Sequence, residues 1–226
     1  MKITFYGQNC FGIETDKFKI LTDPFITGND LAKDKIDIQD LEADFIFLTH
    51  AHQDHTLDAE AIAKNTGATI VTNFEIANHY EEKGFNVHPM NHGGSWDFDF
   101  GKAKYVNAIH TSSFPDGSYG GQPGGFVFSI GDKTIYMAGD TALTMDMKLI
   151  PMEFDLDIAI LPIGDNFTMG IHDAIKASDF VECDKIIGCH YDTFGFIEID
   201  HDKARSQFEL AGKELTLMEI GSSMEL

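Results

Sequence analysis

The sequence has little positive charge. Its 226 residues include 16 Lys and Arg against 37 Asp and Glu, which gives a formal net charge of −21, and Arg205 is its one arginine. A protein that binds DNA or RNA neutralises phosphates with lysine and arginine, so this field repels polyanions. We therefore expect no nucleic-acid partner and a small-molecule substrate.

Cysteines and long apolar runs are also scarce. Cys10, Cys183 and Cys189 form no C-x-x-C pair and are too few for a disulfide framework, so we expect reduced, buried thiols. No apolar run approaches the roughly 20 residues that a membrane span needs, and Met1–Tyr6 predicts a strand without a basic start. These features predict a cytoplasmic protein with no membrane partner and leave a homo-oligomer open.

The first part of the chain is strand-rich and then alternates between helices and strands. A short, bounded apolar run at Phe45–Leu48 is typical of a fully buried strand and leads directly into Thr49 and His50. Before it we expect three strands, Lys2–Tyr6, Phe11–Glu14 and Phe18–Thr22. After it we expect a helix, a strand, a helix and a strand at Asp58–Lys64, Ala68–Val71, Phe74–Lys83 and Phe85–His88.

The second part repeats this order. We expect strands at Lys104–Ile109, Gly125–Ile130 and Lys133–Met137, the last two joined by a Gly131-Asp132 hairpin turn. A helix, a strand, a helix and a strand follow at Leu143–Ile150, Ile158–Leu161, Asp173–Val181 and Lys185–Cys189. No Pro/Ser-rich linker separates the halves. The pattern predicts one α/β domain over residues 1–226, a four-layer αββα sandwich of two similar halves with its site at the strand ends.

The segment His50-Ala51-His52-Gln53-Asp54-His55 has four potential metal ligands in six residues. Residues two apart in an extended segment project to the same side, so His50 and His52 can bind one ion. The chain then turns into a helix, where Asp54 and His55 can face a second ion. Two ions about 3.5–4 Å apart are the usual arrangement for a bridging hydroxide.

Single histidine or aspartate residues follow three other predicted strands. His110 follows Lys104–Ile109, Asp140 follows Lys133–Met137 through Ala138-Gly139, and His190 follows Lys185–Cys189. Two ions need more ligands than the hexapeptide offers, so we predict that these three complete the set. The other histidines are weaker candidates: His79 in a helix, His201 in an acidic loop, His88 before a proline, and His92 and His172 in loops beside glycines.

These motifs together resemble the metallo-β-lactamase superfamily. Further strings resemble its uncharacterised metal-dependent hydrolase family close to L-ascorbate-6-phosphate lactonase: Thr22–Phe25, Asn91–Gly94, His110–Ser113, Ala138–Leu143, Leu161–Gly170 and His190–Phe194. The resemblance implies the αββα fold. It also implies that His50, His52 and His110 hold one metal, that Asp54, His55 and His190 hold the other, and that Asp140 bridges them.

The predicted activity is hydrolysis of a small ester, lactone or phosphoester by a metal-bridged hydroxide. Asp54 is the expected general base, and Asp23 is expected to orient a ligand histidine. Histidine and carboxylate ligands suit zinc, manganese and iron; zinc is our first expectation and manganese the second. The expected substrate contacts, some of which could instead serve only to pack a loop over the sheets, are Ser112, Asn166, Thr168, Met169 and Tyr191.

Two other enzyme classes use nearly the same ligands. A ribonuclease Z-like phosphodiesterase needs a basic face, which the sequence lacks. An iron-dependent oxidoreductase on the same fold would be expected to carry a flavin domain or a partner thiol motif, and neither is seen. A non-catalytic metal module is a third alternative, although structural metal sites are closed and the expected one is open.

Overall fold

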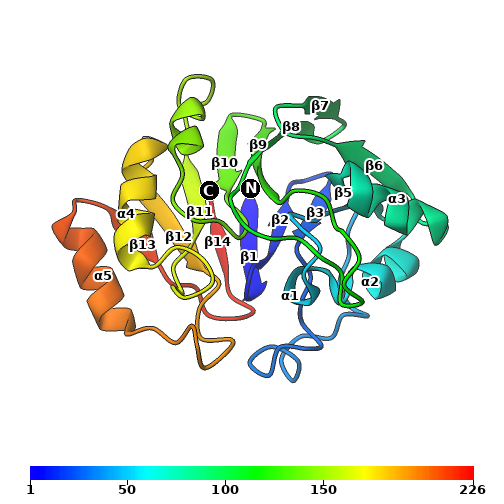
Figure 1. The fold of residues 1–226 in the computed structure, drawn as a ribbon, viewed down its shortest axis with the longest axis horizontal. Coiled ribbons are helices and arrows are strands. Elements are labelled where there is room, and N and C mark those ends of the chain that lie inside the picture. The colour runs from blue at the N-terminus through cyan, green and yellow to red at the C-terminus, as the bar shows by residue number, and fades with distance from the viewer. The chain divides into compact units, whose positions relative to one another are not determined.

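The computed structural model describes all 226 residues, which form two compact units that interleave along the chain. Unit 1 consists of Met1–His92, Thr111–Pro123 and Glu219–Leu226; unit 2 consists of Gly93–His110 and Gly124–Met218. Each unit contains one seven-stranded sheet with helices (Figure 1). The prediction of one domain over residues 1–226 stays a prediction.

The sheet of unit 1 has the order β14-β1-β2-β3-β4-β5-β6. Its first three neighbouring pairs are antiparallel and its last three are parallel. β14 lies beside β1, so the two ends of the chain share an edge of this sheet (Figure 1). The strands are β1 Lys2–Gly7, β2 Cys10–Glu14, β3 Lys19–Thr22, β4 Phe45–Phe47, β5 Thr69–Asn73, β6 Val87–Met90 and β14 Ser223–Glu225.

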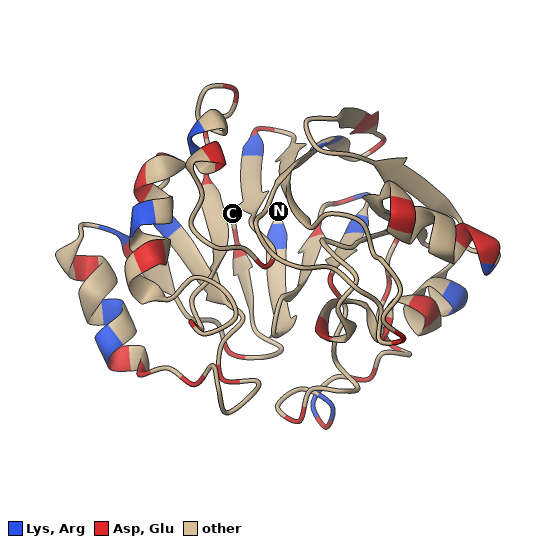
Figure 2. Ribbon diagram, viewed as in Figure 1, with Lys and Arg blue, Asp and Glu red and all other residues tan.

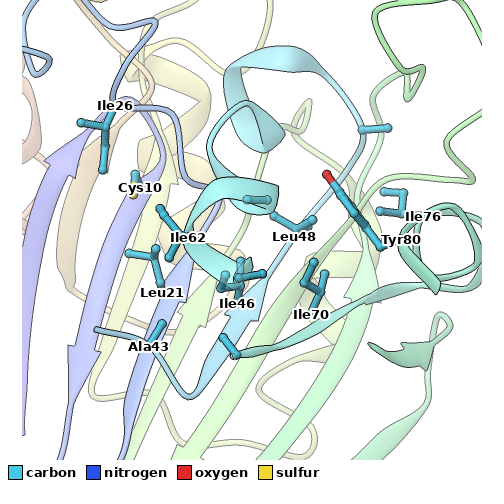
Figure 3. Packing of buried hydrophobic residues seen from close by; sticks show 14 of the residues in the cluster. Cys10, Leu21, Ile26, Ala43, Ile46, Leu48, Ile62, Ile70, Ile76 and Tyr80 are labelled. Carbon is cyan, nitrogen blue, oxygen red and sulfur yellow. The ribbon is translucent and has the colours of Figure 1, made fainter. Parts of the chain in front are cut away.

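Three helices complete unit 1: α1 Gln53–Thr56, α2 Ala59–Thr66 and α3 Phe74–Glu82. The side chain of Asn73 begins α3 by accepting a hydrogen bond from Ile76 N, which satisfies one of the amides that a helix start leaves open. Ile62 of α2 and Ile76 of α3 pack with Ile46 of β4 in one buried cluster (Figure 3). This packing holds the strand that precedes His50.

The sheet of unit 2 has the order β13-β12-β11-β10-β9-β8-β7 and the same division into parallel and antiparallel pairs. The Gly131-Asp132 turn joins β9 to β10 as predicted, with Gly131 at φ 63°, a left-handed conformation that glycine adopts without strain. The strands are β7 Ser95–Phe98, β8 Gly101–Asn107, β9 Gly124–Ile130, β10 Lys133–Met137, β11 Ile158–Pro162, β12 Lys185–Cys189 and β13 Glu214–Thr216.

The helical elements of unit 2 are η1 Met145–Leu149, α4 Ile171–Phe180 and α5 His201–Leu210. Three predictions are wrong here. His172 does not lie in a loop but is the second residue of α4. The segment Leu143–Ile150 forms only a short 3₁₀ helix, because Thr144 has extended backbone and its side chain accepts a hydrogen bond from Asp146 N, so the helix begins at Met145. His201 does not lie in a loop but is the first residue of α5, whose start Asp200 stabilises by accepting from Lys203 N.

Other expectations about the fold are confirmed. The α/β class is confirmed by two mixed sheets with helices. All three cysteines are free and buried, and burial raises the pKa of the Cys10 and Cys183 thiols, which keeps them protonated. Among the helices, none has the length and apolar character needed to cross a membrane.

Candidate metal centre

In unit 1, four potential ligands follow β4 in the segment that was predicted to carry them. His50 is fully buried, and its Nε2 atom lies 3.0 Å from Nδ1 of His52. Asp54 and His55 lie on α1, with Asp54 Oδ2 3.4 Å from His55 Nε2. The ring centroids of His50 and His55 are 4.1 Å apart. One short turn therefore gathers three imidazoles and a carboxylate.

The buried carboxylate of Asp23 holds this turn through hydrogen bonds. Asp23 is fully buried and accepts hydrogen bonds from His55 Nδ1 at 2.8 Å, from Asn9 Nδ2 at 2.7 Å, and from the amide and hydroxyl of Thr49 at 2.8 and 2.7 Å. A histidine that donates from Nδ1 presents Nε2 as an acceptor, which is the tautomer that binds metal. The structure thus places Asp23 where the sequence predicted a residue that orients a histidine.

Gln8 is a site residue that the sequence analysis missed. It lies between β1 and β2 at φ 53°, is almost fully buried, and donates from Nε2 to Asp54 Oδ2 at 2.9 Å. Left-handed backbone in a non-glycine residue is unfavourable and often marks a functional position. A turn with the sequence Gly7-Gln8-Asn9 gives no such signal, because its contact with Asp54 spans 46 residues.

Ser112 fixes the backbone between two of the histidines. Its Oγ accepts a hydrogen bond from Ala51 N at 3.1 Å and donates one to Gly120 O at 2.8 Å. Gly120 packs against Ala51 so closely that a Cβ at this position would lie 2.2 Å from Ala51 Cβ. Ser112 was expected to contact substrate, but these bonds give it a positioning role within unit 1.

In unit 2, three more potential ligands lie together. Oδ2 of the buried Asp140 is 3.0 Å from Nε2 of His190 and 3.4 Å from Nε2 of His110. Asp140 follows β10, His190 follows β12 and His110 follows β8, as the sequence predicted for single ligands at strand ends. His190 itself has a left-handed backbone with φ 54°. One carboxylate oxygen therefore lies between two imidazoles.

The residues around Asp140 hold this arrangement. Thr141 Oγ1 accepts a hydrogen bond from Ile109 N at 3.0 Å, and Ile109 O accepts one from Ala142 N at 3.0 Å. These two bonds join the segment before His110 to the segment after Asp140. These hydrogen bonds therefore fix the backbone positions of His110 and Asp140 relative to each other.

The two clusters have the chemistry of metal ligands. Both offer imidazole nitrogen and carboxylate oxygen, the donors that zinc, manganese and iron accept, and neither contains a cysteine. His50, His55, Asp140 and His190 are buried, and such groups stay buried only when they are paired or bind a metal. The candidate ligands are His50, His52, Asp54, His55, His110, Asp140 and His190.

The predicted substrate contacts of unit 2 have different surroundings. Asn166 is exposed at φ 53°, and Thr168 is half-buried in the same loop. Met169 is 1% exposed and packs in the core of unit 2, which favours a packing role for its side chain. Burial, with Asp192 beside it, raises the pKa of Tyr191, so its phenol stays protonated and can donate a hydrogen bond.

Comparison with known proteins places these observations in a family. A model described as a beta-lactamase superfamily domain matches residues 2–190. The chain is 76% identical over 226 residues to a UPF0173 metal-dependent hydrolase of Christiangramia forsetii, with 100% of both chains covered. It is 43% identical over 231 residues to the UPF0173 metal-dependent hydrolase YtkL of Bacillus subtilis, again with 100% of both covered.

Solved structures share the fold. Igni18, described as a metallo hydrolase from Ignicoccus hospitalis, matches with a TM-score of 0.90 at 32% identity, covering 100% of this chain and 98% of that one. CmlA, a diiron β-hydroxylase from Streptomyces venezuelae, matches with a TM-score of 0.77 at 11% identity over 54% of its own chain, which shows a common fold alone. The expected metallo-β-lactamase-like fold is confirmed.

Proposed function

Because the chain belongs to the UPF0173 metal-dependent hydrolases of the metallo-β-lactamase superfamily, we propose that the ligand clusters of its two units together bind two divalent metal ions. In this proposal Asp140 would be a ligand shared by both ions. The ligands of one ion are His50, His52 and His110, and those of the other are Asp54, His55 and His190.

The observation that carries the proposal is the position of Asp140. Its Oδ2 atom has one imidazole from each of the two proposed ligand sets within 3.4 Å, namely His110 and His190. A carboxylate that is buried between two imidazoles has the placement of a bridging ligand. Unit 1 supplies the four remaining ligands that two ions require.

Bound metal ions would act as Lewis acids and lower the pKa of a coordinated water toward neutrality. Zinc is the metal we expect first, since the ligands are mainly imidazoles, and manganese is the second. Asp23 contributes by holding the His55 ring through Nδ1, so that Nε2 faces the ligands of unit 1.

Asp54 is the proposed general base. Gln8 fixes its carboxylate by donating to Oδ2, and Oδ1 is then the atom that accepts a proton from the attacking water. A general base contributes about 10²- to 10⁴-fold to rate. Asp54→Ala should therefore lower kcat by at least about 100-fold while the thermal unfolding midpoint of the metal-free protein changes little, because Asp54 is partly exposed.

The substrate is proposed to be a small ester, lactone or phosphoester. The sequence strings resemble a family that we expect to be close to L-ascorbate-6-phosphate lactonase, which supports a lactone, and the net charge of −21 weighs against a polyanion. Protein loaded with zinc or manganese should hydrolyse at least one class in a panel of aryl esters, γ-lactones and small phosphodiesters, and structured RNA is included as the substrate of the rival activity. Asp54→Ala protein serves as the blank for each substrate.

The outcome of the panel also separates the alternatives. Robust RNA cleavage without turnover of small esters would favour a ribonuclease Z-like activity. Stoichiometric iron together with thiol-dependent oxygen uptake would favour an oxidoreductase. Turnover that survives in Asp54→Ala would show that Asp54 is not the base.

A further inference from the structure

Two phenylalanine rings lie exposed on loops of unit 2. Phe167 is 51% exposed and Phe196 is 78% exposed, and their ring centroids are 6.3 Å apart with the planes at 75°. This edge-to-face geometry is favourable for an aromatic pair, yet both rings keep much of their surface in water. Grouped large apolar side chains in water mark binding surfaces more often than isolated ones do.

The loops that carry these rings begin at the edge of the sheet where the ligands of unit 2 also lie. β10, β11 and β12 pair in parallel, so their carboxyl ends lie side by side (Figure 1). Asp140 follows β10, Phe167 follows β11, and His190 and Phe196 both follow β12. Binding sites of open α/β sheets lie at this edge.

Close contacts fix the loops relative to the ligands. Met169 N donates to the carbonyl of Thr141, the neighbour of Asp140, at 3.1 Å. A Cβ added to Gly164 would lie 2.1 Å from His190 O and 3.0 Å from Ile197 Cβ, so the two loops meet here without room for another atom. The loops that carry the two rings are therefore in direct contact with the backbone next to Asp140 and His190.

The charge of these loops selects against anions. Residues 163–170 and 190–200 contain Asp165, Asp192, Glu198 and Asp200 and no lysine or arginine. In Figure 2 the ribbon after β11 and after β12 is marked red but not blue until the next helix. A phosphate or carboxylate group beside the two rings would meet these carboxylates and no lysine or arginine of the two loops, whereas an uncharged apolar group would gain contact area.

We propose that Phe167 and Phe196 bind the aryl or alkyl group of an uncharged ester or lactone whose reacting bond lies at the metal centre. This inference rests on the proposed function and narrows its substrate class from esters, lactones and phosphoesters to hydrophobic carboxylic esters and lactones. Phe167 and Phe196 determine specificity, and they take no part in proton transfer.

The test is a series of p-nitrophenyl esters from acetate to octanoate, assayed with the zinc-loaded protein. Each methylene that becomes buried is worth about 0.8 kcal/mol, so kcat/KM should rise up to about fourfold per methylene over the first few carbons. In Phe167→Ala/Phe196→Ala the ratio of kcat/KM between octanoate and acetate should fall at least about tenfold, mainly through KM, because uniform binding is lost. Phe74→Ala, which removes an equally exposed ring from unit 1, is the matched control and should leave the ratio unchanged.

A second measurement does not depend on turnover. N-Benzylacetamide resists hydrolysis, and by calorimetry it should bind the wild-type protein more tightly than the double variant. If the protein hydrolyses esters but the double variant keeps the chain-length ratio, the inference is wrong and the proposed function stands. If only phosphoesters are turned over, the inference is wrong and the proposed function stands. If no ester, lactone or phosphoester is turned over, the proposed function fails, and equal binding of the amide to both proteins would then overturn this inference as well.

The other occupant of the aromatic pair is a second copy of the chain. Light scattering with size exclusion distinguishes it: a double variant that dissociates an oligomer while keeping the chain-length ratio would show a subunit contact and overturn the inference. A double variant that keeps its mass and loses the ratio supports the substrate site.

Discussion

The carboxylate of Asp23 accepts a hydrogen bond from Nδ1 of His55 at 2.8 Å, with both side chains fully buried. Asp23 accepts three further hydrogen bonds, so it joins β3, the β1–β2 turn and the ligand turn in one polar network. The network fixes the His55 ring through its Nδ1 atom. Removing the negative charge should therefore affect both folding and metal binding.

Asp23→Asn should destabilise the metal-free protein by about 3 kcal/mol, since an amide nitrogen would face buried donors in place of a charged acceptor. Zinc affinity should fall about 10- to 100-fold, as is typical when the partner of a ligand histidine is lost. Urea unfolding and a competitive metal titration measure the two effects. Asp16→Asn, in an exposed turn, is the control; an unaltered zinc affinity in Asp23→Asn would contradict the assigned role.

Gln8→Leu tests whether the amide orients Asp54. Leucine has a similar size and the same difficulty at φ 53°, so the variant removes the hydrogen bond to Asp54 Oδ2 and adds little backbone strain. We expect kcat to fall about tenfold or more, with KM nearly unchanged, since the effect of such partners on activity is about 10- to 100-fold. Steady-state kinetics of Gln8→Leu measure this effect, with Gln39→Leu, a substitution at an exposed position, as the control. A change in KM alone would instead indicate that Gln8 contacts substrate.

Ser112→Ala should loosen the turn between His50 and His52. Ala51 N would lose its acceptor in a buried position, which costs about 1–3 kcal/mol, whereas Gly120 O keeps a second donor, Asn73 Nδ2. We expect a lower unfolding free energy and weaker binding of one metal equivalent, measured by urea titration and metal analysis. Ser95→Ala, on the exposed β7, should change neither. Full stability in Ser112→Ala would rule out the positioning role.

His79 should make unit 1 less stable in mild acid. Its ring stacks on Phe114 at a centroid distance of 4.0 Å, and burial, followed by the nearby Lys83, lowers the pKa of His79 below its usual value. The unfolded chain therefore binds a proton that the folded chain resists, so stability is lost as pH falls through the unfolded pKa of about 6.5. His79→Phe keeps the stacking and should flatten the dependence of unfolding free energy on pH between 7 and 5. An identical pH profile in the variant would contradict this.

The places of the candidate ligands at strand ends could be predicted because each depends on local sequence. His110, Asp140 and His190 follow apolar strands, and parallel strands such as β10 and β12 end at one edge. Strand bounds agreed within about three residues for the same reason, namely that burial periodicity sets them. Asp23 could be predicted as a supporting residue because it also ends a strand.

What the sequence did not predict depends on long-range contact. The bond from Gln8 to Asp54 joins a turn to a helix 46 residues away, and β14 forms only because Ser223–Glu225 pairs with β1 at the opposite end of the chain. Met169 lies in a polar loop but is buried, since the backbone of that loop bonds to Thr141 and turns the side chain into the core. No periodic pattern carries such information.

A crystal structure of the zinc-loaded protein with anomalous data at the zinc edge tests the central claim most directly. The account predicts two anomalous peaks about 3.5–4 Å apart, with Asp140 between them and with ligands from both His50–His55 and the strand ends at His110 and His190. A single peak, or peaks that leave His110, Asp140 and His190 beyond coordinating distance, would contradict it.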